Sequence, residues 1–154
     1  MEFQTRIKEG FTVIGKLGST DQGEAFVQRL WEAANSQFEE VAPLAKKNPD
    51  GSLAGIWGLM SDKSGSFRPW ENGFSEGLYL AGVETEEDAQ PPEGWTKWTS
   101  PAYEYRVTEL KGPETFSQAV RALEELGLAL AGAAYDYNCP ATGVGWLYFP
   151  VRRL

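Results

Sequence analysis

The chain has 154 residues, of which 42% are hydrophobic and 23% charged, and its net charge is −8. This balance is typical of one globular domain spanning 1–154, and an acidic chain without a basic patch is not expected to bind nucleic acid directly. The absence of histidine excludes Ser-His-Asp and Cys-His catalysis and most zinc sites, so we expect no metal and no cofactor.

The ends and the cysteine content favour a cytoplasmic protein with no membrane partner. The N-terminal residues carry no apolar stretch typical of a signal peptide, and no apolar run approaches the ~20 residues of a membrane helix. Cys139 is the single cysteine and cannot form an internal disulfide, which fits a reducing compartment. The sequence does not predict the oligomeric state.

The first half of the chain predicts a strand, a long helix and two further strands. Alternation predicts a strand over 11–16 that extends back toward residue 5. Asp21 and Glu24 have the spacing of a capping box, and the apolar periodicity that follows predicts a helix over about 23–46. The turn sequence at 48–51 separates this helix from apolar runs at 53–60 and 74–84, which we interpret as strands.

The second half repeats the same order after an acidic, proline-bearing loop at 85–94. Alternation predicts a strand over 102–110, and helical spacing predicts a helix from Pro113 to about Leu126, before Gly127. Small and apolar residues predict strands over 128–137 and 144–151. The order strand–helix–strand–strand therefore occurs twice, in halves of about 1–86 and 100–154. We expect an α+β fold of two βαββ units related by a pseudo-twofold axis, with antiparallel sheets, both helices on one side and a ligand cleft at the seam.

Glycines alternate with large aromatic residues between 53 and 84, and this pattern has two interpretations. Gly55, Gly58, Gly77 and Gly82 can mark bulges in strands whose aromatic neighbours fill the core. Alternatively, the missing side chains beside bulky rings can form an apolar cavity. We favour the cavity for the cluster as a whole.

Several short segments resemble the GyrI-like small-molecule-binding domain, which is also the effector-binding half of AraC-type and MerR-type regulators. The resemblance covers essentially the whole chain, and its specificity lies in the order and spacing of the segments. They are Phe11-Thr12-Val13-Ile14-Gly15-Lys16, Gly55-Ile56-Trp57-Gly58, Gly77-Leu78-Tyr79-Leu80-Ala81-Gly82-Val83-Glu84, Pro92-Glu93-Gly94-Trp95, Pro101-Ala102-Tyr103-Glu104-Tyr105, Gly112-Pro113 and Tyr148-Phe149-Pro150-Val151.

The resemblance implies two SH2-like βαββ units with an aromatic pocket between them that takes bulky planar or cationic molecules and often contains a carboxylate. A chain of this length is similar to the stand-alone members, some of which sequester drugs or toxins and some of which hydrolyse the cyclopropane of DNA-alkylating natural products. Many members have a glutamate two positions before Tyr148, where this chain has Trp146. The pocket carboxylate must therefore come from elsewhere in the chain.

Three carboxylates are candidates for that role, namely Glu104, Asp136 and Glu76. Glu104 is our first choice, because we expect Tyr103, Tyr105 and Val107 to pack on the second helix and Glu104 to face the cleft. The alternative is an ordinary surface acid. A carboxylate among aromatic rings could anchor a cation or act as a general base for water. The aromatic residues expected to bind ligand are Trp57, Trp70, Tyr79, Trp95, Trp98, Tyr137, Trp146 and Tyr148.

Three functions remain open from the sequence. The first is binding of a hydrophobic, planar or cationic small molecule for sequestration or sensing. The second is hydrolysis of an electrophilic cyclopropane compound, with Glu104 as the catalytic carboxylate. The third is a protein-interaction domain, which an exposed apolar patch would favour. Trp31 is assigned to the core and Cys139 to a structural role.

Overall fold

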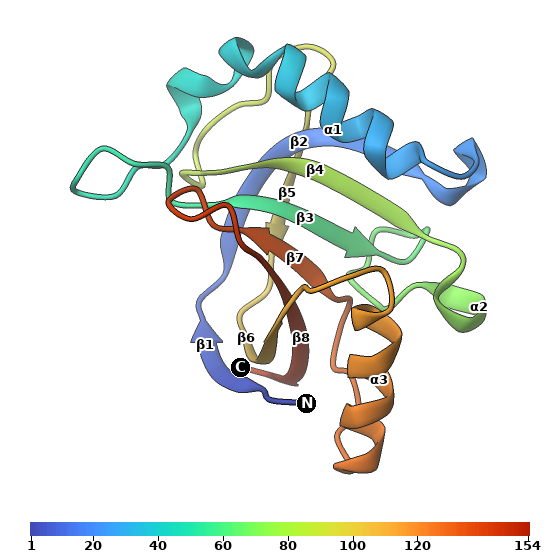
Figure 1. Cartoon of the computed structure of the whole chain (residues 1–154). Helices are drawn as coiled ribbons and strands as arrows, with labels where there is room; N and C mark the ends of the chain where they lie inside the picture. The colour runs from blue at the N-terminus through green and yellow to red at the C-terminus, as the bar shows by residue number, and fades with distance from the viewer.

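Apolar alternation and helical periodicity give fourteen elements in the computed structural model, which describes all residues 1–154 (Figure 1). The strands are β1 (Gln4–Lys8), β2 (Phe11–Ser19), β3 (Ile56–Ser61), β4 (Leu78–Thr85), β5 (Thr96–Ser100), β6 (Tyr103–Glu109), β7 (Tyr135–Asn138) and β8 (Gly145–Arg153). The α-helices are α1 (Phe26–Ser36), α2 (Glu71–Phe74) and α3 (Thr115–Glu125), and the 3-10 turns are η1 (Thr20–Gln22), η2 (Phe38–Glu40) and η3 (Ala42–Leu44).

All eight strands form one antiparallel sheet in the order β1-β6-β8-β7-β3-β4-β2-β5. The first unit is β2-α1-β3-β4 and the second is β6-α3-β7-β8. In each unit the first strand lies beside the last, and the middle strands β3 and β7 pair at the centre. This order reads the same from both edges, which confirms the predicted duplication of βαββ units.

The sheet is curled so that its two edges approach each other. Strands β1 and β2 are joined by only two residues, as are β5 and β6, although the members of each pair lie on opposite sides of the sheet, with β1 and β5 at its edges and β6 and β2 as their inner neighbours. Such short links require the edges to meet, and the sheet therefore has an inner and an outer face. The inner face holds a core of mainly large apolar side chains, which comprises Phe11, Val13, Trp57, Leu59, Leu80, Tyr103, Tyr105, Val107, Ala133 and Tyr135.

Both long helices cover the outer face (Figure 1). Helix α1 packs on β2 and β4, where Ala34 belongs to one apolar cluster with Ile14 and Val83. Helix α3 places Ala119 and Leu123 against Leu147 and Phe149 of β8. Paired residues of neighbouring strands lie on the same face of a sheet. An unbroken series of such pairs leads from the strand of Val83 through β3 and β7 to the strand of Leu147, so α1 and α3 pack on the same face. The prediction of both helices on one side is therefore confirmed.

Several predicted boundaries differ from the structure. The helix expected over 23–46 begins at Phe26, after a left-handed residue at Ala25 (φ 62°), and ends at Ser36. Two 3-10 turns replace its last part, and Pro43, which has no backbone N–H, lies in the second. The capping box is Ser19 with Gln22, not Asp21 with Glu24.

Three strand predictions also change. The first predicted strand is divided into β1 and β2, and β5 was not predicted. The run 74–84 becomes a strand only from Leu78, because Asn72, Gly73 and Phe74 adopt positive φ values in α2. The strand expected over 128–137 is reduced to β7, which begins at Tyr135. The longest α-helices, α1 and α3, have 11 residues each, which is too short to span a bilayer.

Candidate functional site

Aromatic side chains meet on the inner face where the two βαββ units join. Trp57 of β3 pairs with Tyr137 of β7 across the central strand pair, and their ring centroids are 4.7 Å apart. The Tyr148 ring of β8 lies 5.1 Å from the Trp57 ring in an edge-on arrangement. Paired residues of neighbouring strands lie on one face of a sheet, and so do alternate residues of one strand. By this rule all three rings lie on the inner face.

These rings form one wall of a cleft with a volume of about 350 Å³. This volume lies within the range of small-molecule pockets, about 300–1,000 Å³. Most of the lining is hydrophobic, and the charged groups come from β1 and β4. The lining residues are Arg6, Lys8, Ala54, Trp57, Glu84, Val107, Tyr137, Cys139, Trp146 and Tyr148.

Glu84 supplies the only carboxylate of this cleft, and its side chain is 7% exposed. It belongs to β4, where alternation places it on the inner face with Leu80. The indole N–H of Trp57 donates to Glu84 Oε1 at 3.0 Å, and Lys8 Nζ lies 3.5 Å from the same oxygen. A buried carboxylate requires such partners because burial removes its hydration.

Lys8 reaches the cleft from the end of β1 and contacts aromatic rings as well as Glu84. Its Nζ lies 4.4 Å from the ring centroid of Phe11 and 5.5 Å from that of Trp57. Both distances are within the range of a cation–π interaction. The cleft therefore already holds one positive charge between two rings and a carboxylate.

The two tyrosines of the cleft are weak candidates for proton transfer, whereas the pKa of its cysteine is shifted in the other direction. Burial raises the pKa of the Tyr137 phenol to about 12 and also raises the pKa of Tyr148. Hydrogen bonding with Thr142 lowers the pKa of the Cys139 thiol. No group of three histidine, cysteine, aspartate or glutamate side chains could hold a metal ion.

Four of the predicted ligand-binding residues line the cleft, namely Trp57, Tyr137, Trp146 and Tyr148. Glu84 was not singled out from the sequence. A signal for it was present, because Glu84 lies an even number of positions from Leu80 in a largely apolar strand and therefore shares its face. A charged residue at such a position indicates a carboxylate that points toward the core.

Glu104 does not face the cleft, and the predicted orientation of its strand was wrong. Tyr103, Tyr105 and Val107 belong to the inner core, so Glu104 points to the outer face, the face of the helices. It avoids an unpaired charge by accepting from Arg106 at 3.0 Å and from Arg152 at 3.0 Å. Hydrogen bonds from Arg152 and Arg106 lower the pKa of Glu104.

Asp136 and Tyr79 also lie on the outer face, where they form a hydrogen-bonded chain with α1. Trp31 Nε1 donates to Tyr79 Oη at 3.1 Å, and that hydroxyl donates to Asp136 Oδ2 at 2.6 Å. Burial raises the pKa of Asp136 to about 6. Gly58 is required beneath this chain, because a Cβ at that position would overlap the Tyr79 hydroxyl.

The structure does not bring the other predicted residues to the cleft. Trp70 donates its N–H to the Leu78 carbonyl and stacks on Phe26. Trp98 packs edge-on against Phe67, beside the inner core.

Glu76 accepts from Asn72 near α2. Trp95 lies on the outer face under α1, where its N–H donates to Glu40 Oε1 at 2.7 Å.

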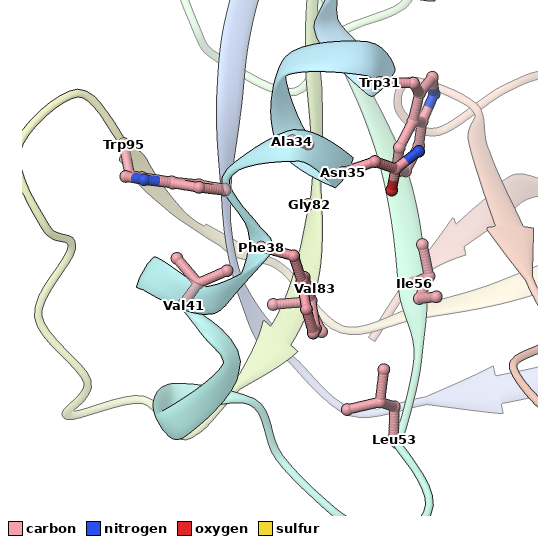
Figure 2. A pocket seen from close by; sticks show the side chains of 10 residues that line it. All are labelled: Trp31, Ala34, Asn35, Phe38, Val41, Leu53, Ile56, Gly82, Val83 and Trp95. Atoms are coloured by element: carbon pink, nitrogen blue, oxygen red, sulfur yellow. The ribbon is translucent and has the colours of Figure 1, made fainter.

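A second, apolar pocket lies under α1 and has a volume of about 170 Å³ (Figure 2). Figure 2 shows Phe38 and Val83 at its centre, Trp31 and Asn35 on one side and Trp95 on the other. Both indole N–H groups donate to residues outside this pocket. Asn35 is therefore its one polar side chain, and no charged group lines it. A larger hollow of about 950 Å³ is lined mainly by polar residues of the N-terminus, β6 and the start of α3.

Comparisons with known proteins support the fold. No family model matches the chain, and no curated protein matches it. Among solved structures, SAV2435 bound to tetraphenylphosphonium is 16% identical, with a TM-score of 0.65 over 99% of this chain and 94% of that one. The C-terminal domain of EcmrR is 14% identical, with a TM-score of 0.65 over 100% of both chains.

An integron cassette protein from Vibrio cholerae is 17% identical, with a TM-score of 0.58 over 97% of this chain and 95% of that one. In the EcmrR–DNA complex, the match has a TM-score of 0.66 and covers 99% of this chain and 58% of that chain. At such low identities these likenesses establish the fold, and the chain has the GyrI-like fold predicted from its sequence segments.

Proposed function

We propose that the inner-face cleft binds a bulky organic molecule with planar aromatic groups and a positive charge, for sequestration or sensing. The observation that carries the proposal is a buried carboxylate, Glu84, held beside the rings of Trp57, Tyr137 and Tyr148 at the seam of the two units. Ring faces attract both planar groups and cations, and a carboxylate in a place with little water attracts a cation more strongly than one at the surface.

Two further observations support this choice of site. The cleft is about twice as large as the apolar pocket under α1, and that pocket has no charged group to orient a cation. SAV2435, which has the same fold, binds tetraphenylphosphonium, a bulky cation with four aromatic rings.

Binding is favoured over hydrolysis by the state of Glu84. A general base must have an oxygen within reach of the water that it activates. Glu84 Oε1 already accepts the Trp57 N–H and contacts Lys8, and the cleft has no second carboxylate that could act as the partner acid. We therefore do not propose a reaction.

The test is a titration of the protein with tetraphenylphosphonium, monitored by calorimetry and by the quenching of tryptophan fluorescence. We expect saturable binding at micromolar concentrations. Glu84→Gln should weaken it about tenfold to a hundredfold, the scale of losing one charge-assisted contact. Glu104→Gln is the matched control, because it makes the same change on the outer face, and it should leave the dissociation constant within about twofold. Equal effects of the two substitutions, or no saturable binding by the folded protein, would refute the proposal.

A further inference from the structure

We infer that Lys8 is a tethered occupant of a cation subsite formed by Phe11, Trp57 and Glu84, and that an organic cation enters this subsite only by displacing the Lys8 ammonium. The inference rests on the function proposed above. It makes Lys8 the residue that sets the preference of the cleft between neutral and cationic guests.

The geometry around Lys8 Nζ is that of a bound ammonium ligand. Two aromatic rings lie within 5.5 Å of the nitrogen, and a carboxylate oxygen lies at 3.5 Å. The Phe11 and Trp57 rings are 4.8 Å apart and tilted by 45°, so they form two sides of a cage. Proteins that bind quaternary ammonium ligands use cages of this composition.

Lys8 can leave this subsite more easily than Glu84 can lose its partner. Lys8 is the last residue of the edge strand β1, which pairs only with β6, and its side chain is 28% exposed. A lysine side chain is flexible and its ammonium is readily hydrated, so it can withdraw into water. The Glu84 side chain is 7% exposed and would remain in the cleft without a counter-charge.

This asymmetry decides which guests can displace Lys8. A cationic guest restores the charge that Glu84 loses when Lys8 withdraws, whereas a neutral guest restores nothing. Neutral aromatic guests therefore bind beside Tyr137 and Tyr148 with Lys8 in place. Arg6 also lines the cleft, so the basic side chains of the cleft outnumber its one carboxylate. The natural chain therefore binds cations less tightly than the aromatic lining of the cleft alone would allow.

The test compares a cationic probe, tetraphenylphosphonium, with a neutral one of related shape, triphenylphosphine oxide. Lys8→Met removes the ammonium and keeps an unbranched apolar side chain. It should tighten binding of the cation by about tenfold or more and change binding of the neutral probe by less than about twofold. Adding Glu84→Gln to this variant should abolish the gain.

Lys16→Met is the matched control. Lys16 also lies over an indole, with Nζ 4.3 Å from the Trp95 ring centroid, but on the outer face of the sheet. This substitution should affect neither probe, because Lys16 does not line the cleft.

The outcomes separate this inference from the proposed function. If both probes bind the natural chain and Lys8→Met changes neither affinity, Lys8 is not a competing occupant and the inference is overturned. If neither probe binds the natural chain or the variant, the proposed function itself fails.

A second measurement uses the chain with Lys8 in place, so it applies even if Lys8→Met does not fold. Reductive methylation with ¹³C labels the lysine amines, and the Lys8 resonance, assigned with Lys8→Arg, should be shifted by the Phe11 and Trp57 rings. Saturating tetraphenylphosphonium should move that resonance to the position of a solvated lysine. A resonance that stays in its ring-shifted position while the probe is bound contradicts displacement.

Discussion

Replacing Asp136 with asparagine should change how the stability of the protein depends on pH. The Asp136 carboxyl accepts a hydrogen bond from Tyr79 on the outer face, and burial raises its pKa from 3.8 to about 6. An acid whose pKa is higher in the folded state than in the unfolded state favours folding when it is protonated. Its contribution is fully present below about pH 3.8 and is lost as the pH rises through 6.

The magnitude follows from the size of this shift. A difference of about two pKa units corresponds to about 3 kcal/mol, and because the residue is only partly buried we expect about 1.5–3 kcal/mol. Asparagine has nearly the same shape, can still accept from Tyr79 and does not titrate. The free energy of unfolding of the natural chain should therefore fall by this amount relative to Asp136→Asn between pH 4 and pH 7.

The assay is urea unfolding at several pH values, followed by circular dichroism and by tryptophan fluorescence. Other carboxylates titrate in the same interval, but they are common to both proteins and cancel in the difference. Curves for the two proteins that remain parallel from pH 4 to pH 7 would refute the argument, because Asp136 would then titrate equally in the folded and unfolded states.

Three further predictions concern packing and burial. Gly58→Ala should destabilise the fold by about 1–3 kcal/mol or more in urea unfolding, because the added Cβ overlaps the Tyr79 hydroxyl. Gly145→Ala should be tolerated, because the nearest atom to its added Cβ is a Leu110 side-chain atom at 3.4 Å. Equal losses of stability in the two variants would contradict this prediction. Trp31→Phe should cost about 1 kcal/mol by removing the N–H that donates to Tyr79, and an unchanged unfolding midpoint would count against that bond. Burial raises the pKa of all six tyrosines. An absorbance titration of the native protein should therefore begin above pH 10, and the stability of the fold should decrease in the same pH range. A titration curve of the native protein that overlays the curve of the protein unfolded in urea would contradict this prediction.

Local sequence patterns predicted the two βαββ units of the fold but not the edge strands of the sheet. The spacing of Phe116, Ala119 and Leu123 was sufficient to predict α3, because an apolar stripe at helical spacing must face a core. The repeated strand–helix–strand–strand order predicted the duplication, because each unit is local in sequence. The separation of β1 from β2 was missed because the side chains of β1 are largely exposed and its pairing with β6 joins residues about 100 positions apart.

The choice between Glu104 and Glu84 could not be made from alternation alone. Our argument for Glu104 assumed that the face with Tyr103, Tyr105 and Val107 packs on the second helix, but in this curled sheet that face packs into the inner core and the helices cover the other face. The partners of Glu104, Arg106 and Arg152, remove the penalty that the argument relied on. The site of Glu84 depends on Lys8 and Trp57, which only the folded sheet brings together.

The most direct test of the account is a crystal structure of the protein with bound tetraphenylphosphonium. The account predicts that the cation lies on the inner face, with its phenyl rings against Trp57, Tyr137 and Tyr148, its phosphorus on the side of Glu84, and Lys8 withdrawn into solvent. A cation bound instead in the apolar pocket under α1, beside Trp31 and Trp95, would contradict the assignment of the cleft as the functional site.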